Sequence, residues 1–231
     1  MRIIRRVDGA VLTALILGAA LESSSAAGSN NADVASERAG EVAISPLCDA
    51  ALRGDLPTVR ALLRKGVPVD ERFQGETALM RALEPFVGMP PATMGPPSGR
   101  ARRAGLKQKA DKFKIAKLLL VAGADVRLTT QEGATPLHLA ALADGPEGLL
   151  IPIVRDLIRR GAPVDARTSE GGTPLQFAVW NQRLELAKML VSAGANLDTR
   201  GAHGKSPAEE LVTHGNQHAL DELRALASKR P

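Results

Sequence analysis

Apolar residues recur along most of this chain at the spacing of one helix face. Residues three and four apart lie on the same side of an α-helix, and glycine accepts the left-handed conformation that closes a helix. Four stretches combine both features: Val59, Leu62 and Leu63 before Gly66; Ala116, Leu119 and Leu120 before Gly123; Val154, Leu157 and Ile158 before Gly161; Ala187, Leu190 and Val191 before Gly194. The pattern predicts four amphipathic helices that end at these glycines.

A second pattern marks where shorter helices begin. Five segments open with a Ser or Thr, which caps free helix N–H groups, and in four of them Pro follows, which fits the first helical position. The opening residues are Ser45, Thr77, Thr135, Thr173 and Ser206, and Ala78 replaces Pro in the second segment. An extended stretch with a turn separates each closing glycine from the next cap. Each unit is therefore predicted to be helix, turn, helix and protruding hairpin.

These units resemble ankyrin repeats, whose period is about 33 residues and whose signature is T-P-L-H-x-A. "TPLHLAA" at 135–141 and "AGADV" at 122–126 carry the resemblance most closely, and it covers roughly residues 45–228. It implies an all-α repeat fold, an ankyrin-type solenoid of about five helix-turn-helix units joined by β-hairpin loops. In such a fold stacked neighbours bury a continuous core that no single unit can bury alone.

Three units depart from the regular pattern. The second carries about 25 extra residues and the third about five, relative to the repeat period. We expect the larger insertion, at about 84–110, to be a basic loop rich in Pro and Gly, whose second half lengthens the following helix. The last unit lacks a closing glycine and is predicted to cap the array with a polar outer face.

The N-terminal residues are predicted to lie outside the fold. Residues 1–27 combine a basic start, an apolar run at 10–21 and a region of small residues, which is the pattern of a secretory signal peptide. Residues 28–44 are expected to be a polar linker. The apolar run is short for a permanent membrane span, so we expect no stable membrane anchor after cleavage, and a periplasmic or secreted protein. An uncleaved helix or a mitochondrial address is the alternative.

The formal net charge of +5 is concentrated in one segment. Residues 85–114 contain seven Lys or Arg and one acidic residue, so the remainder is close to neutral. The basic segment has three interpretations: a solvated loop, an arm for an acidic partner, or a nucleic-acid contact. Its two aromatic residues, Phe86 and Phe113, do not form the series of aromatic residues between basic ones that single-strand binding platforms use, so we expect no nucleic-acid partner.

Few residues in the sequence are candidates for a catalytic or metal-binding site. Cys48 is the single cysteine, and it occupies the unit position that His138 and Gln176 take later. The resemblance implies that this position makes hydrogen bonds between neighbouring units. Gly215 interrupts the i, i+4 pair His214 and His218, which argues against a metal site there. We expect no enzyme activity, no catalytic residue, no metal and no cofactor.

The single tryptophan, Trp180, lies at position eight of its unit, counted from the cap. The resemblance implies that positions eight and nine face a concave groove that binds partners together with the hairpin tips. We expect the groove to carry an apolar column formed by Leu52, Leu83, Leu142, Trp180 and Thr213. Exposed apolar stripes and lone Trp residues are favoured interface anchors. The alternative is that the inserted segments fold over the groove and bury this column.

These observations predict a monomeric module that binds another protein as an adaptor, inhibitor or protective partner. An effector exported to act on a host protein is the alternative, and an enzyme built from the insertion and the groove is a third. The first hairpin is one residue shorter than the others, so its geometry should differ. The candidate partner-binding residues are Trp180, Asn181, Leu142 and Leu52 in the groove, and Phe73, Arg72, Arg167 and Arg200 at the hairpin tips.

Overall fold

The computed structural model describes residues 45–85, 99–143 and 145–229. The chain divides into two compact units, Met1–Ile44 and Ser45–Pro231, and every described residue belongs to the second. The signal peptide and linker expected at residues 1–44 therefore lie outside the described residues.

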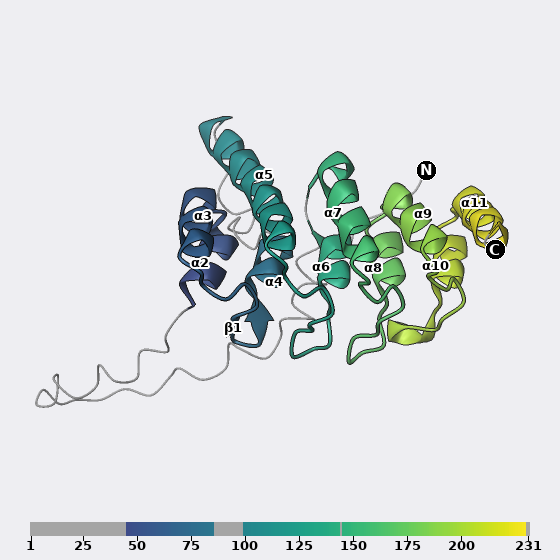
Figure 1. Cartoon of the computed structure of the whole chain (residues 1–231). Coiled ribbons are helices and arrows are strands. Elements are labelled where there is room, and N and C mark those ends of the chain that lie inside the picture. Colours follow the sequence, from purple (N-terminus) through teal and green to yellow (C-terminus); the bar gives the residue numbers. More distant parts are fainter. Residues whose placement is uncertain (1–44, 86–98, 144, 230–231) are drawn as a thin grey trace, which may run out of the picture. The chain divides into compact units, whose positions relative to one another are not determined.

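The described helices form two rows, which Figure 1 shows side by side. The inner row contains the helices that follow the Ser and Thr caps: α2 (Pro46–Arg53), α4 (Ala78–Leu83), α6 (Pro136–Leu142), α8 (Pro174–Trp180) and α10 (Pro207–Thr213). The outer row contains their partners: α3 (Leu56–Arg64), α5 (Gly99–Val121), α7 (Glu147–Arg159), α9 (Leu184–Ser192) and α11 (Gln217–Ser228). Within each row every helix contacts the next one along the chain. The predicted stacking of helical pairs in sequence order is confirmed.

The predicted helix starts are formed by the expected caps. The side-chain oxygens of four opening residues accept a hydrogen bond from the amide three residues later, at distances of 3.2 to 3.4 Å, in Ser45, Thr77, Thr173 and Ser206. At Thr135 the side-chain oxygen does not accept from the amide three residues later. Instead, the backbone amide of Thr135 donates to Nδ1 of His138 at 3.1 Å. The outer helices end as predicted at glycines with positive φ: Gly66, Gly123, Gly161 and Gly194.

The larger insertion mostly extends an outer helix where the structure describes it. Helix α5 has 23 residues, whereas α3 and α9 have 9 each. Residues 99–110 are helical, so the predicted end of the loop at about 110 was wrong, and the prediction that the basic half lengthens the helix is confirmed. Lys, Arg, Ala and Gln in this stretch are strong helix formers. Residues 86–98, the Pro-rich part, lie outside the described residues.

The smaller insertion also becomes helix. Helix α7 has 13 residues, about one turn more than α3 or α9, and the added turn lies at its N-terminal end. The extra residues therefore make α7 longer than α3 and α9, although it stays shorter than α5.

The first hairpin differs from the later ones, as its shorter length predicts. Strand β1 (Arg72–Phe73) pairs antiparallel with β2 (Glu76–Thr77). Gln74 and Gly75 between them have φ values of 54° and 82°, which is what a two-residue type I′ turn requires. The later turns have three residues; in one of them the amide of Thr168 donates to the carbonyl of Gly172 at 3.0 Å. In the last of them, Ala202–Gly204 forms a 3-10 helix, η2.

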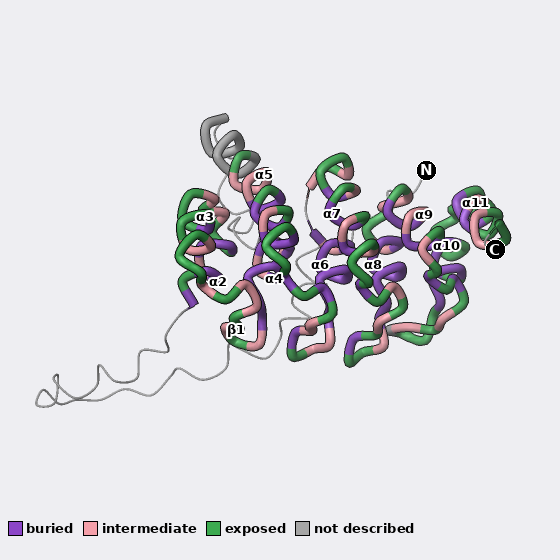
Figure 2. Tube along the Cα trace, viewed as in Figure 1, coloured by how far each residue is buried: buried purple, intermediate pink, exposed green. Residues whose placement is uncertain are grey.

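The core lies between the two rows and is built from Leu, Ala, Val and Ile. Figure 2 shows buried residues throughout the inner helices and on the sides of the outer helices that face them. Of the predicted helix-face residues, all are buried except Leu62, Leu63 and Ile158, which are partly exposed. Two of these belong to α3, whose contacts within the described residues are with α2 and α5 and with no preceding unit.

Candidate functional site

One hydrogen bond recurs where neighbouring units meet. The residue at position four donates to the carbonyl just before the next cap: His138 Nε2 to Gly172 at 3.2 Å, and Gln176 Nε2 to Lys205 at 2.9 Å. The Cys48 thiol makes a weaker version to Glu76 at 3.8 Å. The inter-unit role implied for this position is confirmed in these three units. Met80 takes the position in the second unit, and its sulfur instead accepts from the amide of Thr77 at 3.5 Å.

His138 is held neutral by its surroundings. It is fully buried, and this burial lowers its pKa to about 4 against the weaker opposing effect of its backbone hydrogen bonds. Because Nδ1 accepts from the Thr135 amide, the proton lies on Nε2, which donates to Gly172. The side chain is therefore part of the framework and is closed to a substrate.

His138 gives the fold a testable acid sensitivity. In the unfolded chain its pKa is about 6.5, so between about pH 6.5 and 4 the unfolded state binds more protons and the unfolding free energy falls as pH falls. Replacing it with Gln, the residue that makes the same bond at Gln176, is expected to flatten the pH dependence in this window. Urea unfolding followed from pH 7 to pH 4.5 measures it. An unchanged slope in His138→Gln would contradict this assignment.

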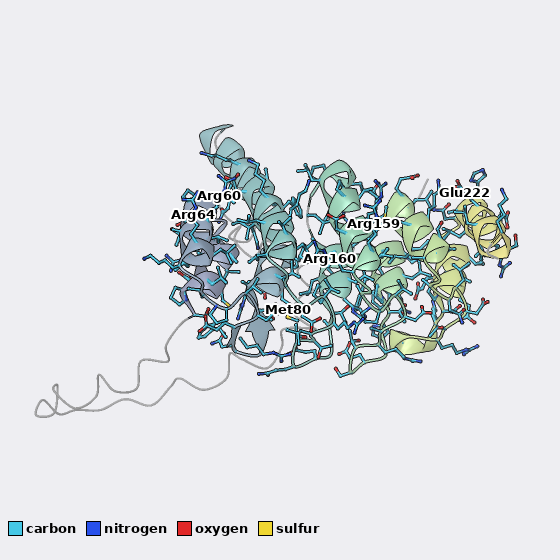
Figure 3. All side chains as sticks on the ribbon, in the orientation of Figure 1. Arg60, Arg64, Met80, Arg159, Arg160 and Glu222 are labelled. Atoms are coloured by element: carbon cyan, nitrogen blue, oxygen red, sulfur yellow. The ribbon has the colours of Figure 1, made fainter. Side chains whose placement is uncertain are left out.

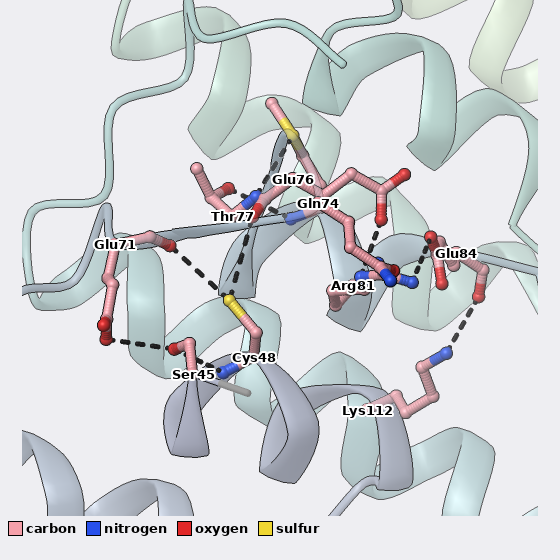
Figure 4. Close-up of polar contacts among 10 residues, drawn as sticks. Ser45, Cys48, Glu71, Gln74, Glu76, Thr77, Arg81, Glu84 and Lys112 are labelled. Atoms are coloured by element: carbon pink, nitrogen blue, oxygen red, sulfur yellow. Dashed lines mark hydrogen bonds and ion pairs between the residues drawn. The ribbon is translucent and has the colours of Figure 1, made fainter. Parts of the chain in front are cut away.

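Cys48 is fully buried. Burial raises its pKa, and the hydrogen bond with Ser45 and the charge of Arg81 oppose that rise. Its sulfur lies 3.5 Å from the carbonyl of Glu71 and its amide donates to Ser45 (Figure 4). A protonated, enclosed thiol fits the structural role expected for this residue.

The expected apolar column is interrupted in the second unit. Counted from the cap Thr77, Leu83 is at position seven, and it is fully buried. Position eight is Glu84, the residue that ends α4. Including Leu83 in an exposed column was therefore wrong, because its position on the helix points it into the core. The inner row carries a charged cluster at this point.

The charged cluster is centred on Arg81, and Figure 4 shows its contacts. Nε of Arg81 lies 2.6 Å from Oε2 of Glu76, and Nη1 lies 3.4 Å from Oε1 of Glu84. Lys112 of α5 donates from Nζ to the carbonyl of Glu84 at 3.0 Å. The inserted helix thereby satisfies a carbonyl at the end of the short helix α4, which requires such a partner.

Burial dominates the electrostatics of this cluster. Burial and the nearby Glu84 together raise the pKa of Glu76 to about 8, and Arg81 opposes the rise without overcoming it. Burial likewise lowers the pKa of Lys112, and the charge of Glu84 opposes that effect. The cluster therefore holds a carboxyl group that keeps its proton in the folded state at a pH where the unfolded chain loses it.

Glu76 should make the fold sensitive to rising pH. Because its folded pKa is above its unfolded value of about 4.5, the folded state binds more protons between about pH 4.5 and 8, and the unfolding free energy falls as pH rises through that range. Glu76→Gln cannot titrate, so we expect its stability to decline less from pH 5 to pH 9. Thermal unfolding at a series of pH values tests this. A variant as alkali-sensitive as the parent would contradict it.

Trp180 lies in a ladder of four rings from two successive units. Phe177 packs edge-on against His138 at 5.6 Å and against Trp180 at 5.4 Å, measured between ring centroids. On the other side of Trp180, the ring of His203 from η2 lies 5.9 Å away. Edge-to-face pairs of this kind add to the energy of burial. The ladder holds the indole in place while leaving it partly exposed.

The other predicted groove residues differ in exposure. Leu52 is 39% exposed and Leu142 partly exposed, so both remain accessible at position eight. Thr213 is exposed at the end of α10. Beside it Val212 is 53% exposed at position seven, which the sequence did not single out. The alternative in which the insertion covers the column involves residues 86–98, which lie outside the described residues.

Asn181 has a structural partner. Its side-chain amide donates to the carbonyl of Ala141 near the end of α6 at 3.0 Å. Arg183 donates to the carbonyls of Ala143 and Gly145 just beyond. Together, Asn181 and Arg183 donate to carbonyls at and after the end of α6, next to the insertion in the third unit. Asn181 is nevertheless exposed, and its role in binding stays a prediction.

The structure brings two of the predicted hairpin-tip residues together. Nη2 of Arg167 donates to the carbonyl of Arg200 at 2.7 Å, and Arg200 in turn lies 3.3 Å from Glu209. These contacts join the hairpins near Trp180. Arg72 is exposed and Phe73 partly exposed on the first hairpin, which contributes a separate part of the surface.

Residues 45–85, 99–143 and 145–229 contain no group of three or more His, Cys, Asp or Glu side chains placed to hold a metal ion. In the same residues no helix is both long enough and apolar enough to span a membrane.

The paired helices and projecting hairpins define an all-α solenoid built from repeats. Residues 106–201 match the family model of ankyrin repeats, in three copies. Residues 106–201 therefore contain ankyrin repeats. It is also similar to the human protein named ankyrin repeat and SOCS box protein 16, with 32% identity over 105 residues, which cover 46% of this chain and 17% of that protein. Ankyrin repeats are protein–protein interaction modules and are generally non-catalytic.

Proposed function

We propose that this chain binds another protein through its inner helices, with Trp180 as the main anchor, and that it acts stoichiometrically as an adaptor, inhibitor or protective partner rather than as an enzyme. The observation that carries the proposal is the state of Trp180. Its ring is fixed between Phe177 and His203, and within the described part of the chain its indole N–H has no acceptor. A fixed aromatic ring with a free donor binds a partner at low entropic cost.

The surroundings of Trp180 support this choice of anchor. Binding hot spots are enriched in Trp and Arg and lie within a surface that excludes water. Accessible apolar side chains flank Trp180 along the inner row, and Arg167 and Arg200 lie on the adjoining hairpins. Leu142 on one side and Val212 on the other extend the apolar surface to the neighbouring units.

The location we propose is the periplasm of a bacterium, reached through a cleaved signal peptide at residues 1–27. The support is the order of basic, apolar and small residues in that stretch. N-terminal sequencing of the mature chain from a periplasmic fraction tests it. Recovery of the chain with Met1 in the cytoplasm would refute this location and leave the binding role untouched.

Affinity capture from a cell-envelope extract tests the binding role. The full chain, Trp180→Ala and Leu149→Ala are immobilised in parallel, because Leu149 is an exposed apolar residue on the outer row. We expect a protein retained by the parent and by Leu149→Ala, lost with Trp180→Ala, and eluting with the parent in a complex of fixed stoichiometry. Retention by the parent and by both variants would remove Trp180 from the site.

A further inference from the structure

The outer row has one face whose charge is all of one sign. On α3, α7 and the described part of α5, every exposed charged side chain is Lys or Arg. We define the cationic face as this set together with Lys65 and Arg160, the residues that follow the last turns of α3 and α7. Its members are Arg60, Arg64, Lys65, Lys107, Lys114, Lys117, Arg155, Arg159 and Arg160. The acidic residues on these helices, Asp111, Glu147 and Asp156, are only partly exposed, and the exposed acidic residue beside them is Asp55, which caps the start of α3.

Most of these cations form no ion pair with another described residue. Lys114 pairs with Asp111 at 2.8 Å, and Arg159 lies 3.9 Å from Asp156. Within the described residues the remaining members of the cationic face form no ion pair: Arg60, Arg64, Lys65, Lys107, Lys117, Arg155 and Arg160. Positive charges without counter-charges repel one another and destabilise the folded state, so they favour binding of an anionic partner.

The cationic face ends after α7. On α9, Lys188 bridges Glu185 at 2.9 Å and Glu222 of α11 at 2.7 Å. Asp221 is exposed on α11, so these last two outer helices carry both signs. Figure 3 shows Arg60 and Arg64 on α3, Arg159 and Arg160 at the end of α7, and Glu222 on α11. The positive charge is therefore a property of three adjacent helices.

The cations on α5 line up with an exposed apolar residue. Steps of seven, three and four residues connect Lys107, Lys114, Lys117 and Val121, and such steps keep side chains on one helix face. This line is about 21 Å long at the rise of an α-helix. Val121 at its end is 71% exposed, and Leu149 on α7 is 44% exposed. The face thus combines many cations with isolated apolar groups.

We propose that the cationic face docks on the anionic phospholipid headgroups of a membrane surface. Each Lys or Arg near such a surface contributes about 1 kcal/mol of attraction, and exposed apolar groups enter the headgroup layer. The charged groups lie at the ends of long Lys and Arg side chains on three helices, α3, α5 and α7. Lipids move laterally and gather beneath such charges, whereas a folded acidic protein must match them in fixed positions.

A nucleic-acid partner fits this face less well. Single-strand binding relies on exposed aromatic rings between the basic residues. Within the described part of α3, α5 and α7 the one aromatic side chain is Phe113, which is buried. The chemistry on the face is therefore charge with a few aliphatic groups, as at a lipid headgroup layer.

Lipid docking is independent of the proposed protein-binding site. Trp180 and its ladder belong to the inner row and the hairpins, and the cationic face belongs to the outer row. One surface can meet a membrane while the other holds a partner. Failure of one proposal leaves the other intact, since Trp180→Ala changes no residue of the cationic face.

Vesicle co-sedimentation of the full chain tests the proposal. The vesicles contain equal parts of phosphatidylglycerol and phosphatidylcholine, or phosphatidylcholine alone. The test variant combines Arg64→Glu, Lys117→Glu and Arg155→Glu. The control combines Arg72→Glu, Lys205→Glu and Arg224→Glu, which are exposed residues elsewhere without ion pairs among the described residues. Both variants change the net charge equally, and both keep residues 1–44.

We expect the parent and the control variant to bind anionic vesicles in a salt-sensitive manner, and the test variant to bind about 100-fold more weakly. Equal loss in both variants would show an effect of net charge alone and would overturn the proposal. So would unchanged binding by the test variant. A stronger preference of the same face for duplex DNA or polyglutamate at matched salt would assign it to a different class of partner.

Discussion

Replacing Trp180 with Ala is expected to weaken the complex with the protein partner by about 2 kcal/mol, which is roughly 30-fold in the dissociation constant. The loss has two physical sources. The partner no longer covers a fixed indole ring, and the polar group that accepted from the indole N–H loses its donor. Titration calorimetry with the captured partner measures the change.

The controls for this experiment separate binding from folding. Trp180→Phe keeps an aromatic ring against Phe177 and His203 but removes the N–H, so it should lose less affinity than Trp180→Ala. Leu149→Ala on the outer row should bind like the parent. Circular dichroism and the melting temperature establish that each variant is folded. Full affinity in folded Trp180→Ala would end the assignment of Trp180 as the anchor.

Replacing Leu157 with Ala is expected to lower the unfolding free energy by about 3 kcal/mol. Leu157 is fully buried on α7 at one of the predicted helix-face positions. Its truncation removes apolar contacts and leaves a cavity that rigid, stacked neighbours fill poorly. For a chain of this size the melting temperature should fall by roughly 6 to 12 °C. Calorimetry or urea unfolding measures both quantities.

Leu149→Ala serves here as the matched control, since it makes the same chemical change on the same helix at an exposed position. It should cost less than about 1 kcal/mol. A comparable loss in the two variants would mean that the packing between the rows is not what stabilises α7. A negligible loss in Leu157→Ala would contradict the core described above.

The fold could be predicted because each unit repeats the same local signals. A hydroxyl cap, an apolar face and a closing glycine each fix a backbone conformation within a few residues, and five near-copies reinforce one another. The end of the loop in the second unit was harder to place. The basic stretch after the Pro-rich part has helix-forming residues but no cap signal, so the start of α5 at Gly99 was not marked in the sequence.

The candidate site was predictable only in part. Trp180 and Leu142 occupy the expected positions, whereas Leu83 was misplaced by one position in its unit and lies in the core. The ladder through His203 depends on how a hairpin folds back over the first helix of its own unit, which periodicity does not reveal. The cationic face was missed for the same reason. Counting along the chain assigns the positive charge to one segment, and only stacking places α3 and α7 beside α5.

The unequal bonds between units suggest how the array would respond to tension along its length. His138 and Gln176 each tie their unit to the next with a firm hydrogen bond, and Cys48 with a weak one, but Met80 has no donor to offer. The junction between the second and third units therefore lacks this bond and is joined between its hairpins by the Ser169 amide, which donates to the carbonyl of Glu132 at 2.8 Å. When the chain is pulled from its two ends, we expect the second and third units to separate first. The two resulting groups of units can re-associate because the helices within each group remain stacked.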